Sequence, residues 1–193
     1  MTEPACVSRQ DKTMKIIKCA ACFCFLFFVH SAMAALNPGV IDAARYGEVN
    51  ILKKAVASGF DINQRDEHGY TLLILATYHG QYDTAKYLLS QGADPSLLDN
   101  HGRSALMGAA YKGDINAAKV LLSDPRTNIN QQNEVGQTAG MYAALFGHRA
   151  FLSYMLKQGA DLSLSDKQGN SAATLATQQG NTSLSGWITS QSK

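Results

Sequence analysis

Hydrophobic and polar positions form blocks that return along the chain at a fixed spacing. Each block holds a polar turn, a short run of small and apolar residues, and a second run that contains paired aliphatic side chains. The glycines of the polar turns mark a step of 33 or 34 residues: Gly69, Gly102, Gly136 and Gly169. A regular step of this length is the signature of a repeat architecture.

Each block predicts a turn, a helix cap and a short helix. An Asp or Asn lies three residues before each turn glycine, which favours a turn in which the glycine adopts positive φ. A hydroxyl residue lies two residues after that glycine, where its oxygen can cap a following helix: Thr71, Ser104, Thr138 and Ser171. A second set of glycines should end this first helix: Gly47, Gly80, Gly113, Gly147 and Gly180.

The aliphatic run of each block predicts a second helix. Its paired side chains are expected to fill the core between blocks: Ile51-Leu52, Leu88-Leu89, Leu121-Leu122 and Met155-Leu156. A single block buries too little surface to be stable alone, so stability must come from stacking. We therefore predict an all-α solenoid of about five helix-turn-helix units joined by β-hairpin-like loops, at about residues 38–65, 66–98, 99–132, 133–165 and 166–189.

Three units depart from the common pattern. The first lacks the hairpin and opens at Pro38 directly into a helix, and the last is polar where inner units are apolar, so both are interpreted as caps. The third unit carries one extra residue in the segment 123–127. We interpret this segment as a loop insertion rather than a functional element, because loops lengthen at little entropic cost.

The blocks resemble the ankyrin repeat, whose consensus is D-x-x-G-x-T-P-L-H-x-A-A-x-x-G-H followed by L-L-x-x-G-A-D. The second unit shows the match, with Asp66, Gly69, Thr71, Gly80 and the run 92–94, and the resemblance covers roughly residues 38–187. No unit has the Pro or His of T-P-L-H, so apolar contact is expected to replace the hydrogen bond of that histidine. Gly140 inside a predicted helix should cost about 0.5–1 kcal/mol relative to alanine.

The resemblance implies a binding surface formed by the hairpin tips and the exposed positions of the first helices. The positions that match this surface are Tyr46, Glu67, His68, Tyr70, Tyr78, His79, Asn100, His101, Arg103, Tyr111, Lys112, Glu134, Val135, Gln137, Leu145 and Phe146. Aromatic side chains recur there just before the helix-ending glycines, and interfaces favour aromatic anchors. The alternative is that these rings only cover the loops beneath them.

The amino end predicts a secretory signal peptide at residues 1–34. Lys15 and Lys18 precede an apolar run of 11 residues, and Ala32-Met33-Ala34 fits a signal-peptidase site. As a helix this run spans roughly 16 Å, against about 30 Å of bilayer hydrocarbon, so a retained membrane anchor is the weaker alternative. Residues 1–13 are interpreted as a start-site extension before Met14. The chain after cleavage, residues 35–193, is expected to be periplasmic or secreted.

Composition excludes several classes of function. All four cysteines lie before Ala34. The chain after Ala34 has 13 basic and 13 acidic residues and no basic stripe, which argues against nucleic-acid binding. No P-loop, G-x-S-x-G or H-E-x-x-H motif is present, and no cofactor is predicted. The pairs Asp66/His68 and Asp99/His101 leave a metal-dependent enzyme as an alternative, although exposed contact residues are the preferred interpretation.

These observations predict a non-enzymatic, exported protein-protein interaction module that is monomeric when free. Small bacterial proteins with a signal peptide and four or five ankyrin units are similar to this chain. That similarity implies a periplasmic role in toxin neutralisation or in protection against oxidative stress. A secreted effector that acts on a host protein is the alternative from a different class.

Overall fold

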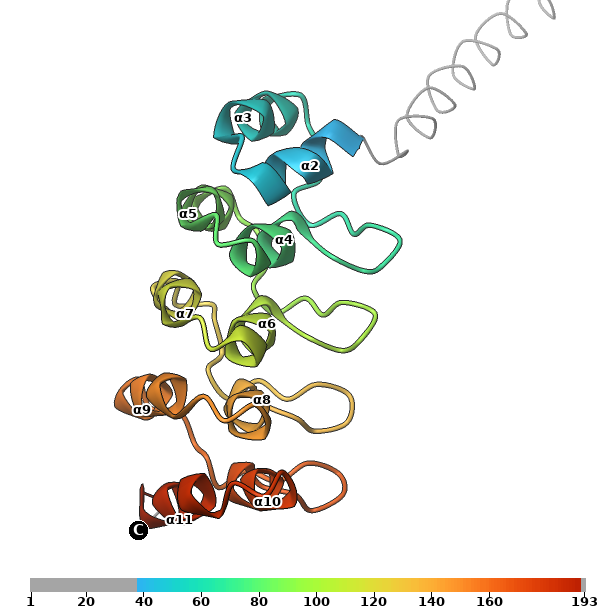
Figure 1. Cartoon of the computed structure of the whole chain (residues 1–193). Coiled ribbons are helices and arrows are strands. Elements are labelled where there is room, and N and C mark those ends of the chain that lie inside the picture. Colours follow the sequence, from blue (N-terminus) through green and yellow to red (C-terminus); the bar gives the residue numbers. More distant parts are fainter. Residues whose placement is uncertain (1–37, 192–193) are drawn as a thin grey trace, which may run out of the picture. The chain divides into compact units, whose positions relative to one another are not determined.

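The computed structural model describes residues 38–191 (Figure 1). This part of the chain contains ten helices in five consecutive pairs, joined by loops. The first helices of the pairs are α2 (Pro38–Tyr46), α4 (Leu72–Tyr78), α6 (Ala105–Lys112), α8 (Ala139–Leu145) and α10 (Ala172–Gln178). The second helices are α3 (Val49–Ala57), α5 (Tyr82–Ser90), α7 (Ile115–Leu122), α9 (Arg149–Lys157) and α11 (Thr182–Gln191). The predicted all-α helical solenoid is confirmed.

The helices of residues 38–191 form two layers. The first helices stack on one another in chain order, and the second helices form the outer layer beside them (Figure 1). The loops that precede α4, α6, α8 and α10 project from the side of the first helices that faces away from the outer layer. Two of these loops carry an antiparallel β-bridge, Arg65 with Thr71 and Ser165 with Ser171, which makes them hairpin-like.

The predicted hydroxyl caps are all present. The hydroxyl oxygens of Thr71, Ser104, Thr138 and Ser171 accept hydrogen bonds from the backbone N–H three residues later, over 3.2–3.4 Å. Apolar contact replaces the consensus histidine at Ile74, Met107 and Met141, which are buried. At the equivalent position of the last unit, Thr174 is exposed, and it completes a capping box with Ser171. The last unit therefore replaces a core contact with a polar helix cap.

The core lies between the two layers and between successive units. Ala43, Ala44, Ala76, Ala110, Ala143 and Ala176 are fully buried, which lets the first helices approach closely. Of the first aliphatic pair, Leu52 is fully buried but Ile51 is 42% exposed, so the prediction that Ile51 fills the core is wrong. Consecutive helical residues point about 100° apart, and only one member of this pair faces the core.

Gly140 is buried within α8 because Leu162 fills the space beside it. A Cβ at position 140 would lie 2.7 Å from Leu162 Cδ2, which is closer than ordinary van der Waals contact. The helix-propensity penalty predicted for this glycine therefore accompanies a close approach between α8 and the loop after α9. Alanine would gain propensity but would force Leu162 to shift.

Successive hairpins are joined by hydrogen bonds near their tips. The backbone N–H of Asn100 donates to His68 O over 3.0 Å, and Asn100 Nδ2 donates to Glu67 O over 2.9 Å. Further along the stack, the Lys167 N–H donates to Val135 O over 3.0 Å. These bonds satisfy backbone groups that the loops would otherwise leave unpaired, and they fix the spacing of the tips.

Replacing Gly69 by alanine should destabilise the fold more than the same change at Gly169. Both glycines have positive φ, +78° and +82°, so both substitutions introduce backbone strain of about 1–2 kcal/mol. A Cβ at position 69 would also lie 2.6 Å from the backbone N of Asn100, whereas a Cβ at position 169 meets nothing within 4 Å. Chemical denaturation of both variants measures the difference, and equal losses would show that hairpin contact adds nothing.

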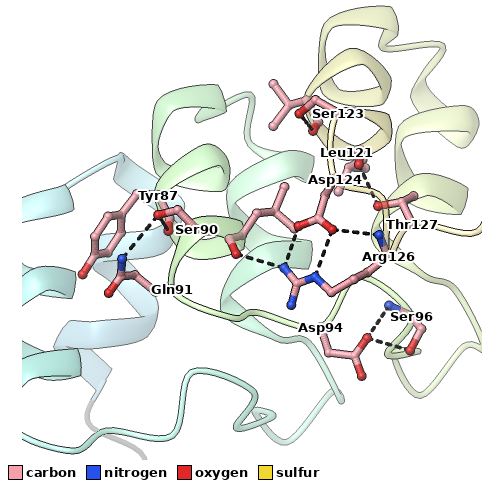
Figure 2. A network of polar contacts seen from close by, with 12 residues as sticks. Tyr87, Ser90, Gln91, Asp94, Ser96, Leu121, Ser123, Asp124, Arg126 and Thr127 are labelled. Atoms are coloured by element: carbon pink, nitrogen blue, oxygen red, sulfur yellow. Dashed lines mark hydrogen bonds and ion pairs between the residues drawn. The ribbon is translucent and has the colours of Figure 1, made fainter.

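The insertion in the third unit closes the end of α7 and contacts the preceding unit. Figure 2 shows Arg126 beside Asp124 in a polar network. The guanidinium of Arg126 pairs with Asp124 over 2.6 Å and donates to the Leu89 carbonyl over 2.9 Å. Thr127 Oγ1 donates to Leu121 O over 2.6 Å. The hydrogen bond from Arg126 lowers the pKa of Asp124 below its usual value. The structure thus gives this loop a packing role at the ends of α5 and α7.

The predicted signal peptide lies outside the described residues. Within residues 38–191, no helix combines the length and the hydropathy that crossing a membrane requires.

Candidate functional site

The predicted site residues come from the hairpin tips and the ends of the first helices. Most of their side chains are exposed: Tyr46, Glu67, His68, Tyr78, His79, Asn100, His101, Tyr111, Lys112, Glu134, Val135 and Phe146. Four are partly buried: Tyr70, Arg103, Gln137 and Leu145. Because the tips and helices are stacked, the exposed group runs along several units rather than gathering at one point.

Four exposed rings, Tyr46, Tyr78, Tyr111 and Phe146, occur at the ends of consecutive first helices, and we call them the aromatic row. Their exposed fractions are 71%, 40%, 37% and 45% in that order. The rings of Tyr111 and Phe146 meet edge to face with centroids 4.4 Å apart. Lys112 Nζ lies 4.6 Å from the centre of the Tyr78 ring, within cation–π range.

Leu145 does not join the aromatic row. It is partly buried and packs against the hydrophobic core, while its neighbour Phe146 is exposed. Leu145 ends α8 and Phe146 caps it, and consecutive positions of a helix face different directions. The side chain of Leu145 is thus mostly engaged within the protein.

The carbonyls that underlie the aromatic row are tied to the following unit. Gln81 Nε2 donates to Arg45 O over 3.2 Å, and Lys112 Nζ donates to Tyr78 O over 2.5 Å. His148 Nε2 lies 2.9 Å from Tyr111 O and acts as the donor to that carbonyl. All three carbonyls lie two residues before a helix-ending glycine. One side chain from the next unit therefore fixes the backbone at each of these positions.

A hollow of about 410 Å³ opens beside α4 and α6, next to the aromatic row. Its walls include Tyr46 and Arg45 from the end of α2, Tyr70 from a hairpin, Tyr78 and His79 from the end of α4, and Arg103 and Asp99 from the next hairpin. The wall is therefore built from three consecutive units and combines aromatic faces with two guanidinium groups.

Asp99 holds Arg103 in the wall of this hollow. The buried Asp99 carboxylate accepts hydrogen bonds from the backbone N–H groups of His101 and Arg103, over 2.8 and 2.9 Å. It also accepts from Arg103 Nε over 3.0 Å, and Arg103 Nη2 reaches Tyr70 Oη at 3.5 Å. Burial disfavours the charge of Arg103, but the bonds to Asp99 outweigh it and raise the pKa of the guanidinium.

Arg45 is a basic wall residue that sequence reasoning missed. Its guanidinium lies 3.4 Å from Asp42 and 3.8 Å from Asp66, both long for an ion pair. Arg45 lies two residues before the helix-ending glycine of its unit. Tyr78 and Tyr111 hold the same position in the next two units. That shared register is the signal that could have identified it.

His79 lines the hollow together with Arg45, and Lys112 lies close to the Tyr78 ring of the same wall. Burial lowers the pKa of His79, and the nearby charges of Arg45 and Lys112 lower it further. A lowered pKa keeps the imidazole neutral near pH 7. The cationic groups that face the hollow are thus the arginines, with Lys112 close by.

The Asp/His pairs of the hairpin tips serve the turns themselves. Asp66 Oδ1 accepts from the backbone N–H groups of His68 and Tyr70, over 2.9 and 2.8 Å, as Asp99 does in the next unit. Among residues 38–191, no group of three His, Cys, Asp or Glu side chains is placed to hold a metal ion. The geometry of the tips is therefore that of turn-stabilising carboxylates.

Comparison with known families agrees with the repeat geometry. The family model described as ankyrin repeats (3 copies) matches residues 40–133 and residues 106–188, and together these overlapping matches cover more than half of the chain. No curated protein matches the sequence.

Proposed function

The chain belongs to the ankyrin-repeat family, and from this premise we propose that its aromatic row and the adjoining hairpin tips bind a protein partner. Family membership indicates a protein-protein interaction module. The observation that carries the choice of surface is an exposed ring at the end of the first helix in each of four consecutive units. Partner affinity after substitution of Tyr78 and Tyr111 tests it.

The aromatic row is suited to binding because the backbone that carries it is held in place before a partner arrives. Side chains of the following units hydrogen-bond the carbonyls of Arg45, Tyr78 and Tyr111. The ring of Tyr111 also packs against that of Phe146. Side chains that are held before binding lose less conformational entropy on association. An aromatic anchor of this kind contributes more to affinity than a mobile polar residue of equal area.

The alternative, that the rings only cover the loops beneath them, accounts for part of their area. Tyr111 and Phe146 do cover each other through their edge-to-face contact. Each ring of the row nevertheless keeps more than a third of its surface exposed, and Tyr46 keeps 71%. That remaining apolar surface is what a partner would bury.

We further propose that the free protein is a monomer. The last unit exposes a set of polar side chains: Thr177, Gln178, Gln179, Thr182 and Ser183. A polar outer face on the terminal repeat stops a solenoid from stacking end to end. The balanced charge of residues 35–193 supports a protein partner rather than a nucleic acid.

Export to the periplasm is part of the same proposal, with toxin neutralisation or protection against oxidative stress as the role there. Lys15, Lys18, the apolar run after them and the small residues at 32–34 support it. We expect N-terminal sequencing of the periplasmic fraction to find a chain that begins at Ala35. A charge placed in the apolar run, Leu26→Asp, should abolish this form.

Fractionation also separates the alternatives. Recovery of the chain from the culture medium would favour the secreted effector that acts on a host protein. Recovery of an uncleaved chain from the cytosol, unchanged by Leu26→Asp, would contradict export. Neither result depends on the identity of the partner.

A further inference from the structure

We propose that the hollow between Arg45 and Arg103 receives an aspartate or glutamate side chain from an extended acidic segment of the protein partner. This inference rests on the proposed function, because the hollow adjoins the aromatic row. It adds the chemistry of the partner, which family membership does not give. The proposal rests on two guanidinium groups, on the carboxylates around them and on the aromatic side chains of the walls.

The two arginines keep hydrogen-bonding capacity for a ligand. A guanidinium carries five N–H donors, and carboxylates are its preferred partners. Asp99 and Tyr70 engage Nε and Nη2 of Arg103, which leaves Nη1 for a further acceptor. Arg45 donates a hydrogen bond to Asp42 over 3.4 Å and lies 3.8 Å from Asp66. Both distances exceed the roughly 2.7–2.9 Å of a strong charge-assisted bond, so a ligand carboxylate could bind Arg45 at shorter distance.

The carboxylates of the protein do not fill this site. Of the three that pair with these arginines, Asp99 alone lines the hollow, and its side chain is 2% exposed. Asp66 is 7% exposed and already accepts two backbone N–H bonds. Asp42 is half exposed but does not line the hollow. The acidic groups are therefore engaged or set back, and the wall presents positive charge.

The lowered pKa of His79 also depends on positive charge near the hollow. Burial is the largest cause of this lowered pKa, and the positive charges of Arg45 and Lys112 are the next causes. Burial disfavours a charge of either sign, so only the contributions of Arg45 and Lys112 bear on the sign of the potential. Both of these contributions favour a negative group near His79.

The remaining walls select what surrounds the ligand carboxylate. Tyr46, Tyr70 and Tyr78 line the hollow, and the first and last of these belong to the exposed aromatic row. Its volume of about 410 Å³ exceeds that of one carboxylate side chain, so an adjacent apolar residue can enter as well. The preferred partner segment thus has an Asp or Glu next to an aromatic or aliphatic residue.

Panning a random-peptide phage library against the purified full chain tests this inference. We expect the enriched peptides to share an Asp or Glu beside an apolar residue, and to bind less tightly as salt is raised. Arg45→Gln should weaken them about tenfold, in line with loss of a charge-assisted hydrogen bond. The control Arg149→Gln removes the same charge from α9, where Arg149 lies 4.9 Å from the Trp187 ring, and should leave affinity unchanged.

The outcomes separate the inference from the proposed function. Enriched peptides without an acidic preference, whose binding is lost in Tyr78→Ala but not in Arg45→Gln, would overturn the inference and keep the binding surface. No enrichment, or peptides that bind both variants as well as the natural protein, would overturn both. Circular dichroism of each variant establishes that it is folded. Arg103→Lys, which keeps a charge beside Asp99, serves as the second test and should also weaken binding.

Discussion

Replacing Phe151 by alanine should lower the free energy of unfolding by about 3–5 kcal/mol, the range seen when a large aromatic side chain leaves a cavity in a packed core. Phe151 lies on α9 and is 1% exposed, among the largest fully buried side chains of the described residues. Units of a solenoid are stabilised mainly by their neighbours. The loss should therefore fall on the fourth and fifth units first.

The chain offers a matched control five residues earlier. Phe146 is 45% exposed, so Phe146→Ala removes the same atoms from the surface and should change stability by at most about 1 kcal/mol. Urea denaturation followed by circular dichroism measures both variants. Equal losses from the two substitutions would contradict the assignment of Phe151 to the core and Phe146 to the surface.

Replacing Tyr78 and Tyr111 together by alanine should weaken partner binding by about 2–4 kcal/mol, roughly 30-fold or more, while leaving the fold intact. Both rings lie at the centre of the aromatic row, and each is exposed by more than a third in the free protein. A ring that becomes buried against a partner loses that burial when it is truncated. Isothermal titration calorimetry with a captured partner measures the change.

Ile51→Ala is the control for this prediction. Ile51 is 42% exposed, but it lies on α3 in the outer helix layer, away from the hairpin tips. Its truncation removes exposed apolar surface from a different face and should leave affinity unchanged. If the double tyrosine variant bound as tightly as the natural protein, the aromatic row would not be the binding surface.

The solenoid could be predicted because its signals are local and repeated. Thr71 and Gly69 specify a cap and a turn within three residues of each other, and the same pattern recurs at Ser104 and Gly102. Each copy independently supports the same architecture. A departure in one unit, such as the exposed Thr174, therefore leaves the architecture unchanged.

The misplacement of Ile51 and the partial burial of Leu145 share one physical origin. Both belong to pairs of adjacent apolar residues, and the sequence does not state which member faces the core. Helix phase decides this, and it depends on where the helix begins and on how it packs against its neighbour. Leu52 is fully buried in the first pair, and in the second pair Leu145 is partly buried and packs against the core.

The hollow could not be predicted from single positions. Arg45 and Arg103 are 58 residues apart in sequence and belong to different repeat positions. They line one wall only because α2, α4 and the next hairpin are stacked. Arg103 could be identified as a surface candidate from its unit alone, but its anchoring by the buried Asp99 required the structure.

Site-specific photo-crosslinking tests the central claim most directly, because it captures the partner whatever its identity. A benzophenone side chain is placed at Tyr111 in one variant and at Ile51 in another. Each variant is irradiated in cells of the organism that produces the protein. The proposed surface predicts a covalent adduct with another protein from position 111 and none from position 51. An adduct from position 51 alone, or from neither position, would contradict binding through the aromatic row.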